Sequence, residues 1–319
     1  MTGGSSTAVR LAVDLGGTTT RVALVHGARV VDRREAPTPA REGPSVAVEV
    51  VAALAEPFLD RVDAVCVAVT GHVRGGTVTA VNRETLPGWD AFPLADALAA
   101  RCGRSVRLVN DAHAAAWGEA RFGAGRGARD FVFVTVSTGI GAGVIAGGQL
   151  LLGSRGLGGH LGFWRGIDPA GDEILERSTS GTGLARAGAA AFGPGTTARD
   201  VFERAAVGDA RAQAIVAEAV DRLARALVDA RWLVDPERVA IGGSVGLAPG
   251  YLERLAATLR GLEPRDPLMV VAAELGADAG LLGAADLLGD DDRLGAADLL
   301  GDAGGRESAS PADPSPPSE

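Results

Sequence analysis

The 319-residue sequence contains no lysine, and all 31 of its basic residues are arginine. A phosphate-binding loop of the Gly-Lys-Ser/Thr type and a Schiff-base lysine are therefore excluded. Cysteine occurs only at Cys66 and Cys102, which is too few for a disulfide framework or a cysteine-based zinc cluster. Any phosphate chemistry must then use backbone amides, hydroxyl groups, arginine and a metal ion.

Aromatic residues make up only 4% of the chain against 46% hydrophobic residues, so the cores must be largely aliphatic. No apolar run reaches the ~18 residues that a membrane-spanning helix needs. The N-terminus lacks the basic and apolar segments of a secretory signal, so a cytoplasmic protein without membrane contact is the default expectation. The net charge of −9 argues against a nucleic-acid-binding surface, which would be basic.

The most informative stretch that is present is an apolar run ending at Asp14. The chain then turns on Gly16 and Gly17 and enters a hydroxyl-rich strand at Thr18. Such a turn can bring backbone N–H groups and hydroxyls to a phosphate. Because Mg²⁺ prefers oxygen ligands and keeps several waters, we expect Asp14 to hold water on Mg²⁺.

A second turn of the same kind lies in the strand–turn–strand pattern of residues 131–146. It contains Thr138, Gly139 and Gly141, again with threonine in place of lysine. The two turns together predict two halves that close on one polyphosphate and contact its β- and γ-phosphates from two sides.

The order of predicted elements also repeats. Each half opens with three strands and continues with alternating helices and strands, which predicts a duplicated α/β fold. We expect a small domain over 9–115, a larger one over 116–277, and a terminal helix at about 278–290 that packs on the first. Residues 1–8 and 291–319 are expected to be disordered tails, since the segment 282–290 recurs letter for letter at 294–302 and the end is rich in Gly, Ser and Pro.

The pair Asn110-Asp111 follows a short strand and precedes a predicted helix. Asp111 is a good helix N-cap, which is one interpretation of its position. The other is a general base on the floor of a cleft, which accepts the proton of an attacking hydroxyl.

Five segments, at 14–21, 108–111, 137–143, 156–163 and 241–244, together resemble the ROK family of sugar kinases, in the actin/hexokinase-like superfamily. The resemblance spans residues 10–290. It implies duplicated actin-like (ribonuclease H-like) domains, each with a mixed five-stranded sheet flanked by helices, and a cleft between them. It also implies Mg²⁺- and ATP-dependent phosphorylation of a hexose hydroxyl, with Asp111 as the base.

The sequence departs from the family at its zinc motif. Family members commonly have Gly-x-x-Gly-Glu-Ile-Gly-His, but here the Glu position is His160 and the zinc-binding His position is Phe163. The three cysteine positions fall on Ile167, Pro169 and Ile174. We therefore expect no zinc site, with apolar packing to order this segment instead.

The resemblance places His160 and Glu176 near the sugar. Bacterial N-acetylmannosamine kinases resemble this chain both in the histidine at His160 and over residues 110–117. An imidazole has one donor and one acceptor and tolerates a bulkier 2-substituent than a carboxylate does. This implies an N-acylmannosamine, phosphorylated on its 6-hydroxyl; the alternative is a loop histidine with only a backbone bond.

Other positions carry weaker predictions. Arg21 contacts a phosphate or is an ion-pair partner, His113 is expected on the helix surface, and Trp89 is expected in the core. The resemblance implies contacts with the sugar from Gly71, Asn82 and Asn110, and with the nucleotide from Gly242, Gly243 and Ser244.

Two rival functions stay open. A ROK glucokinase, or another hexose kinase, would share the mechanism. A non-catalytic sugar sensor of the family would need a helix-turn-helix, but only about eight residues precede the first strand. The sequence leaves open whether polyphosphate replaces ATP and whether the chain forms a homodimer.

Overall fold

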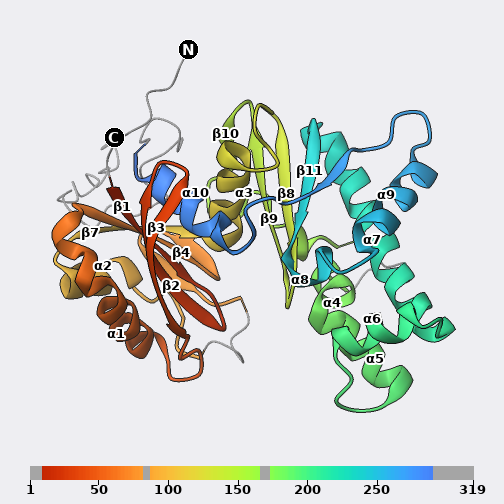
Figure 1. The fold of residues 1–319 in the computed structure, drawn as a ribbon, viewed down its shortest axis with the longest axis horizontal. Helices are drawn as coiled ribbons and strands as arrows, with labels where there is room; N and C mark the ends of the chain where they lie inside the picture. Colours follow the sequence, from red (N-terminus) through yellow and green to blue (C-terminus); the bar gives the residue numbers. More distant parts are fainter. Residues whose placement is uncertain (1–8, 82–86, 166–172, 290–319) are drawn as a thin grey trace, which may run out of the picture.

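The computed structural model describes residues 9–81, 87–165 and 173–289, which form two five-stranded sheets (Figure 1). In the first sheet the order is β3-β2-β1-β4-β7, with β1 to β3 antiparallel and β4 and β7 parallel to β1. A hairpin of β5 and β6 follows β4. The elements of this half are β1 (Val9–Leu15), β2 (Thr19–His26), β3 (Arg29–Pro37), α1 (Pro44–Ala55), the 3₁₀ helix η1 (Glu56–Arg61), β4 (Ala64–Val69), β5 (His72–Arg74), β6 (Thr77–Thr79), α2 (Leu94–Cys102) and β7 (Ser105–Asn110).

The second sheet repeats this arrangement in the order β10-β9-β8-β11-β12. Strands β8 to β10 are antiparallel, and β11 and β12 run parallel to β8. The elements are α3 (Asp111–Phe122), β8 (Phe131–Val136), β9 (Ile140–Ala146), β10 (Gln149–Leu150), η2 (Leu161–Phe163), α4 (Leu175–Thr179), α5 (Gly181–Phe192), α6 (Ala198–Ala206), α7 (Ala210–Val234), β11 (Arg238–Gly242), α8 (Gly243–Gly246), α9 (Tyr251–Leu262), β12 (Val270–Ala272), η3 (Gly276–Asp278) and α10 (Ala279–Leu287).

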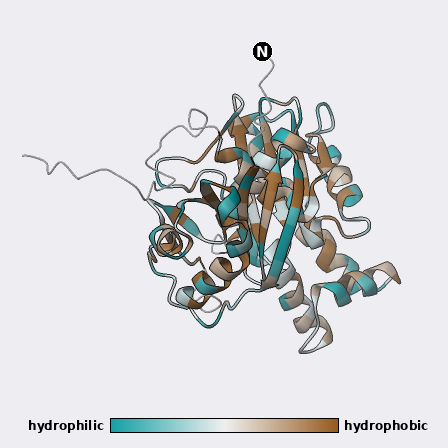
Figure 2. Cartoon of the chain, turned by 60° about the vertical axis from the view of Figure 1, so that its left-hand side comes forward, coloured by the Kyte–Doolittle hydropathy of each residue, from teal (hydrophilic) through white to brown (hydrophobic). Residues whose placement is uncertain are grey.

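Strands β1 and β4 are hydrophobic along almost their whole length because helices cover both faces of the first sheet. Val13 and Val67 are fully buried in the cluster that includes α1 and α2. Their neighbours Ala12 and Ala68 point to the opposite face, toward α3 and α10. Alternate residues of a strand thus supply two cores. Figure 2 shows the resulting hydrophobic strands at the centre of the molecule.

Helix α10 packs tightly against α3 at the junction of the two halves. A Cβ on Gly283 would lie 1.8 Å from the carbonyl oxygen of Ala114, so the two helix backbones are in direct contact there. Asp286 accepts hydrogen bonds from the Trp117 indole (2.9 Å) and from Arg121 (3.0 Å). Helix α10 also packs on β1 and β4, so it connects the end of the described chain to the first sheet.

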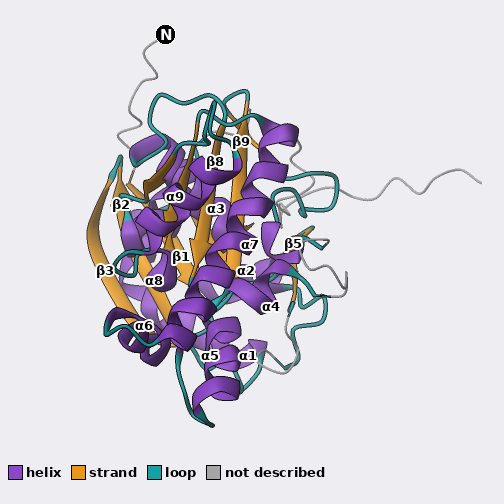
Figure 3. Cartoon of the chain, turned by 90° about the vertical axis from the view of Figure 1, so that its right-hand side faces the viewer, coloured by secondary structure: helices purple, strands orange, loops and turns teal. Residues whose placement is uncertain are grey.

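In the second half, helices α4 to α7 and α9 lie together on the side of the sheet away from the first sheet (Figures 1 and 3). Helix α3 covers the other face. Cys66 and Cys102 are both buried and unbridged. Within the described ranges, no helix is both long enough and apolar enough to cross a membrane.

The predicted fold, two actin-like α/β units with mixed five-stranded sheets, is confirmed. The boundary expected between residues 115 and 116 falls inside α3, which is one continuous helix. Because α3 packs on β8, β9 and α10, it forms part of the junction between the halves. The tails expected at 1–8 and 291–319 lie outside the described residues.

Candidate active site

Asn110 and Asp111 lie where β7 ends and α3 begins. Asn110 is the helix N-cap, since its Oδ1 accepts the backbone N–H groups of Ala112 (3.0 Å) and His113 (3.2 Å). Its Nδ2 donates to the carbonyl oxygen of Gly71 at 3.0 Å. The interpretation of Asp111 as the N-cap is therefore wrong. Asparagine and aspartate are equally good N-caps, so the sequence alone could not choose between these neighbours.

Asp111 is the first residue of α3, and two hydrogen bonds fix its half-buried carboxylate. Oδ2 accepts the hydroxyl of Thr70 at 2.8 Å, and Oδ1 accepts the N–H of Ala112 at 2.8 Å. Thr70 directly follows β4, whose last residue, Val69, pairs with Asn110. Neighbouring parallel strands end at the same edge of a sheet, which brings Thr70 to Asp111. Thr70 is not among the residues predicted from the sequence; its position directly after a buried strand was the available signal.

Asp14 lies near the end of β1, directly opposite Arg21 on β2. Arg21 donates to Asp14 at 3.1 Å and also lies 3.5 Å from Glu35, which favours the ion-pair alternative for Arg21. Burial, aided by the negative charge of Asp111, raises the pKa of Asp14 to about 6 despite the opposing effect of Arg21. An additional positive charge is favourable at such a carboxylate, and this fits a hydrated Mg²⁺.

The turn between β1 and β2 presents its tip to solvent. Gly17 and Thr18 are exposed, and a Cβ on Gly17 would meet nothing within 4 Å. The N–H of Gly16 instead donates to the carbonyl oxygen of Thr19 at 3.3 Å, which closes the turn. The open side of the turn therefore has room for a ligand that accepts hydrogen bonds.

The equivalent turn of the second half lies between β8 and β9, with Thr138 exposed at its tip. Thr182 of α5 donates to the carbonyl oxygen of Thr138 through its N–H (3.2 Å) and its hydroxyl (2.9 Å), which ties the turn to that helix. Gly141 lies farther along β9, where a Cβ would come within 2.8 Å of the Cβ of Ala112. The structure thus places Gly141 in the packing of β9 on α3, and its contact with ATP stays a prediction.

Gly242, Gly243 and Ser244 form the passage from β11 into α8. The hydroxyl of Ser244 lies 3.2 Å from that of Ser137, so this passage meets the β8–β9 turn. Gly243 has φ of +83°, and a Cβ there would lie 2.3 Å from the carbonyl oxygen of Val136. The structure therefore brings together the two segments predicted to contact nucleotide in the second half.

Gly243→Ala is expected to lower the free energy of unfolding by about 2–4 kcal/mol, because the methyl group clashes with backbone and the positive φ is strained. Thermal unfolding measures the loss. Gly261→Ala is the matched control: Gly261 is an exposed helical residue of α9 with nothing within 4 Å of its Cβ position. It should raise stability by about 0.5 kcal/mol or leave it unchanged. Equal stabilities of the two variants would contradict the close approach at Gly243.

His160, predicted to contact the sugar, is surrounded by rings from distant parts of the chain. Its ring centroid lies 5.0 Å from that of His113 on α3 and 5.5 Å from that of His72 on β5, both edge-on. Burial lowers the pKa of His160, while the charge of Asp111 opposes this shift. His113 is buried and not on the helix surface as expected, because its face of α3 is covered by the loop that carries His160.

Glu176 on α4, which was also predicted to contact the sugar, contacts the turn between β8 and β9. Its Oε2 accepts the N–H of Ile140 at 2.8 Å and occupies the space beside Gly139, where a Cβ would lie 2.6 Å from that oxygen. The side chain thus contacts the turn between β8 and β9 in this structure, and its contact with the sugar stays a prediction.

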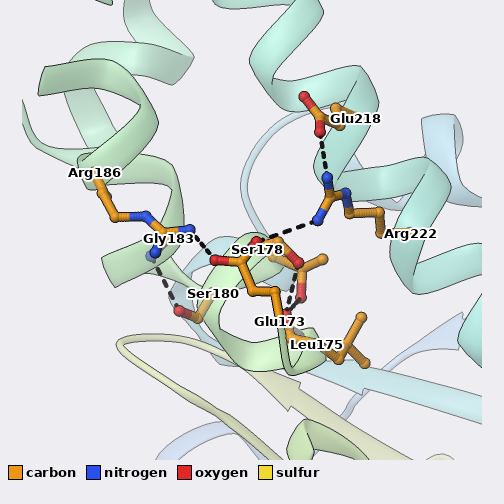
Figure 4. Close-up of polar contacts among 9 residues, drawn as sticks. Glu173, Leu175, Ser178, Ser180, Gly183, Arg186, Glu218 and Arg222 are labelled. Atoms are coloured by element: carbon orange, nitrogen blue, oxygen red, sulfur yellow. Dashed lines mark hydrogen bonds and ion pairs between the residues drawn. The ribbon is translucent and has the colours of Figure 1, made fainter. Parts of the chain in front are cut away.

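Helix α4 is held in place by a polar network (Figure 4). Glu173, which precedes the helix, forms ion pairs with Arg186 of α5 and with Arg222 of α7, the latter at 3.4 Å. Arg222 also bonds Glu218 at 2.7 Å, and the Ser178 hydroxyl donates to a carbonyl within α4 at 3.1 Å. These contacts order the chain that leads to Glu176.

The segment that carries the zinc motif in other family members is closed by backbone and apolar contacts. The carbonyl oxygen of Trp164 accepts the N–H of Leu175 at 2.9 Å, and Trp164 packs on the core of the second half. Ile167 and Pro169 lie outside the described residues, so the absence of zinc stays a prediction. Among the residues described, no group of three or more His, Cys, Asp or Glu side chains is arranged to hold a metal.

The remaining predicted residues have the following places. Gly71 has φ of +124°, and a Cβ there would lie 2.9 Å from the carbonyl oxygen of Thr79, so the site requires glycine. Trp89 is buried, and its prediction as a core residue is confirmed. Asn82 lies outside the described residues, and its contact with the sugar stays a prediction.

Comparison with known proteins identifies the family. The sequence model of the ROK family matches residues 10–291. The chain belongs to the ROK family. The predicted resemblance is thereby confirmed.

Among curated relatives, this chain is 43% identical over 273 residues to the bifunctional enzyme NanE/NanK of Brucella melitensis. That match covers 86% of this chain and 52% of the relative, so the chain spans about half the length of that protein. It is 41% identical over 285 residues to the N-acetylmannosamine kinase of Shigella boydii, which covers 86% of this chain and 96% of the relative.

Solved structures agree on the fold. The ROK hexokinase from Thermus thermophilus has a TM-score of 0.78 and 34% identity over 89% of this chain and 99% of its own. A ROK glucokinase from Streptomyces griseus, solved with glucose and AMPPNP, has a TM-score of 0.75 and 30% identity over 88% and 99%.

Proposed function

We propose that this chain transfers the γ-phosphoryl group of ATP to the 6-hydroxyl of an N-acylmannosamine, with Asp111 as the general base. The observation that carries the proposal is the place of Asp111: it follows β7 at the sheet edge where β1 carries Asp14, and it lies two residues before His113, whose ring contacts His160. The base thus stands between the predicted donor and acceptor sides. The relative named N-acetylmannosamine kinase supports the choice of acceptor.

In this mechanism Thr70 fixes one oxygen of Asp111, and the carboxylate accepts the proton of the sugar hydroxyl. The hydroxyl oxygen attacks the γ-phosphorus in line, and the bond to the departing ADP oxygen breaks. Mg²⁺, when bound near Asp14 through water, supplies positive charge to the phosphates. The developing negative charge is stabilised by N–H and hydroxyl donors from Gly17, Thr18, Thr138 and Gly139, while the N–H of Gly16 holds the first turn closed.

The ROK hexokinase and glucokinase structures, at 34% and 30% identity, favour a second candidate, a glucose kinase. His160 argues against it, since a carboxylate can accept bonds from two hydroxyls and an imidazole cannot. A cytoplasmic location and a homodimer remain proposals beside the activity.

The test is ADP release from Mg²⁺ and ATP with N-acetylmannosamine, N-acetylglucosamine, glucose and mannose side by side. N-Acetylmannosamine should give a kcat/KM at least about tenfold above each other sugar, the factor expected for a bulky group that fits or clashes in one pocket. A parallel assay with polyphosphate in place of ATP tests which of the two is the phosphate donor. A clear preference for glucose would establish the second candidate, and no response to any sugar would end the kinase proposal.

A further inference from the structure

His113 is the most deeply buried histidine of the chain's described part, with 1% of its surface exposed. Burial lowers its pKa to about 4, so the imidazole is neutral at physiological pH. No step of the proposed phosphoryl transfer uses this side chain. A buried polar side chain that takes no part in the reaction has either a structural role or a role in positioning other residues.

The hydrogen bond of His113 fixes which nitrogen carries its proton. Nε2 lies 2.6 Å from the carbonyl oxygen of Gly158. A carbonyl oxygen can only accept, and a neutral imidazole has one N–H, so Nε2 must donate. The ring of His113 is thereby held in one tautomer and one orientation.

Gly158 lies two residues before His160, in a loop whose backbone is closely packed. A Cβ on Gly158 would lie 2.6 Å from the carbonyl oxygen of Leu151, and one on Gly156 would lie 2.6 Å from that of Val73. Val73 belongs to β5 of the first half, so the loop is confined between the halves. The hydrogen bond from His113 to the carbonyl oxygen of Gly158 further restrains this loop, two residues before His160.

The imidazole of His160 is also held directly. His113 contacts it edge-on, His72 contacts it from β5, and Phe163 lies 6.2 Å away. The Nδ1 atom of His160 is buried. The contacts from three rings therefore restrict the orientation of the His160 imidazole.

Packing near this contact is incomplete. A cavity of about 10 Å³, roughly the space of one water, is lined in part by Asn110, His113, Leu152 and Gly156. The hydrogen bond from His113 to Gly158 ties the loop to α3 beside this cavity.

We propose that His113 is a positioning residue of the acceptor site, which fixes the loop at Gly158 and orients the imidazole of His160 toward the sugar. This inference rests on the proposed function, in which His160 contacts the acceptor. It predicts that His113 affects recognition of the sugar and leaves recognition of ATP unchanged.

The test compares His113→Leu, which removes the donor, with His113→Gln, which keeps an N–H donor. For the leucine variant, KM for the sugar should rise about tenfold while KM for ATP stays within about twofold. The glutamine variant should recover most of this loss. His26→Leu is the matched control, since His26 is exposed at the end of β2 far from the Gly16–Thr18 turn, and it should behave as wild type.

A double-variant cycle tests whether His113 acts through His160. In a His160→Ala background, His113→Leu should raise KM for the sugar by no more than about twofold further. Independent, multiplying effects would overturn the proposal, as would parallel increases of both KM values, which indicate general loss of structure.

The wild-type assay separates this inference from the proposed function. If glucose is the preferred acceptor, KM for glucose is compared between the wild type and the His113 variants, and the same criteria test whether His113 is a positioning residue. If no sugar is phosphorylated, calorimetric titration of wild type and His113→Leu with each sugar decides instead. Binding weakened about tenfold in the variant supports the positioning role, and unchanged or absent binding overturns it.

Discussion

Replacement of Asp111 by asparagine is expected to lower kcat by about 10²–10⁴-fold, while Kd for the sugar changes by less than about threefold. Asparagine keeps the shape of the side chain: its oxygen can still accept the N–H of Ala112, and its NH₂ group can donate to the hydroxyl oxygen of Thr70. An amide cannot accept the proton of an attacking hydroxyl, so only the chemical step is lost. Steady-state ADP release gives kcat, and calorimetric titration gives Kd.

Asp63→Asn is the matched control for this variant. It removes the same charge from an exposed residue just before β4, and its kcat should remain within about twofold of wild type. An Asp111→Asn enzyme with more than about a tenth of wild-type turnover would exclude Asp111 as the base. A large loss of sugar affinity with kcat retained would assign it to binding instead.

The fold could be predicted from the sequence because its signals are local. A β-branched run such as 62–70 is typical of a strand buried on both faces, and β4 spans Ala64–Val69. The glycine- and threonine-containing turns after β1 and β8 could likewise be predicted, because their residues are adjacent in the sequence. The equivalence of the halves then follows from the repeated order of elements.

The site could be predicted only where function follows from chain position. Asp14 and Asp111 lie near the ends of β1 and β7, which parallel pairing through β4 brings to one edge of the first sheet. The second turn has the equivalent place after β8 in the other sheet. Local sequence could not decide between Asn110 and Asp111 as N-cap, since both side chains suit that position.

Side chains whose surroundings come from distant segments escaped prediction. His113 has the helical position of a surface residue, and it is buried only because the loop at Gly158 crosses α3. Glu176 contacts Ile140 because α4 is fixed by ion pairs to α5 and α7. Such contacts depend on the packing of whole elements, which no local pattern encodes.

Asp14→Asn is expected to reduce kcat/KM for ATP by about 10²–10³-fold, because in the proposed mechanism Asp14 is the charged group that would hold a water of Mg²⁺ near the phosphates. The same change should make the protein more stable at neutral pH. Burial and the charge of Asp111 make the ionised form of Asp14 costly, and asparagine has no charge to bury. Arg21 retains Glu35 as a partner at 3.5 Å.

The pH dependence of this stability has a definite sign. The pKa of Asp14 is raised from its ordinary value of 3.8 to about 6, so the folded protein binds the proton more tightly than the unfolded chain. The contribution of Asp14 to the free energy of unfolding therefore falls as pH rises from about 4 to about 6, by up to about 3 kcal/mol. The lowered pKa of His113 acts in the opposite direction over this range, but it does so in both proteins and cancels in their difference. The asparagine variant lacks this loss, so the two proteins should converge near pH 4 and differ most above pH 6.

Denaturant unfolding at several pH values measures the stability difference, and ADP release measures the loss of activity. Asp60→Asn, an exposed change in η1, should alter neither. An Asp14→Asn protein that is less stable than wild type at pH 7 would show that the Arg21 ion pair outweighs the cost of burying the charge. An active variant would remove Asp14 from the donor site. The expected result is that the Asp14→Asn variant is more stable and less active than wild type. Because the charge of Asp14 makes the folded state less stable, this result would mean that the carboxylate is retained for catalysis.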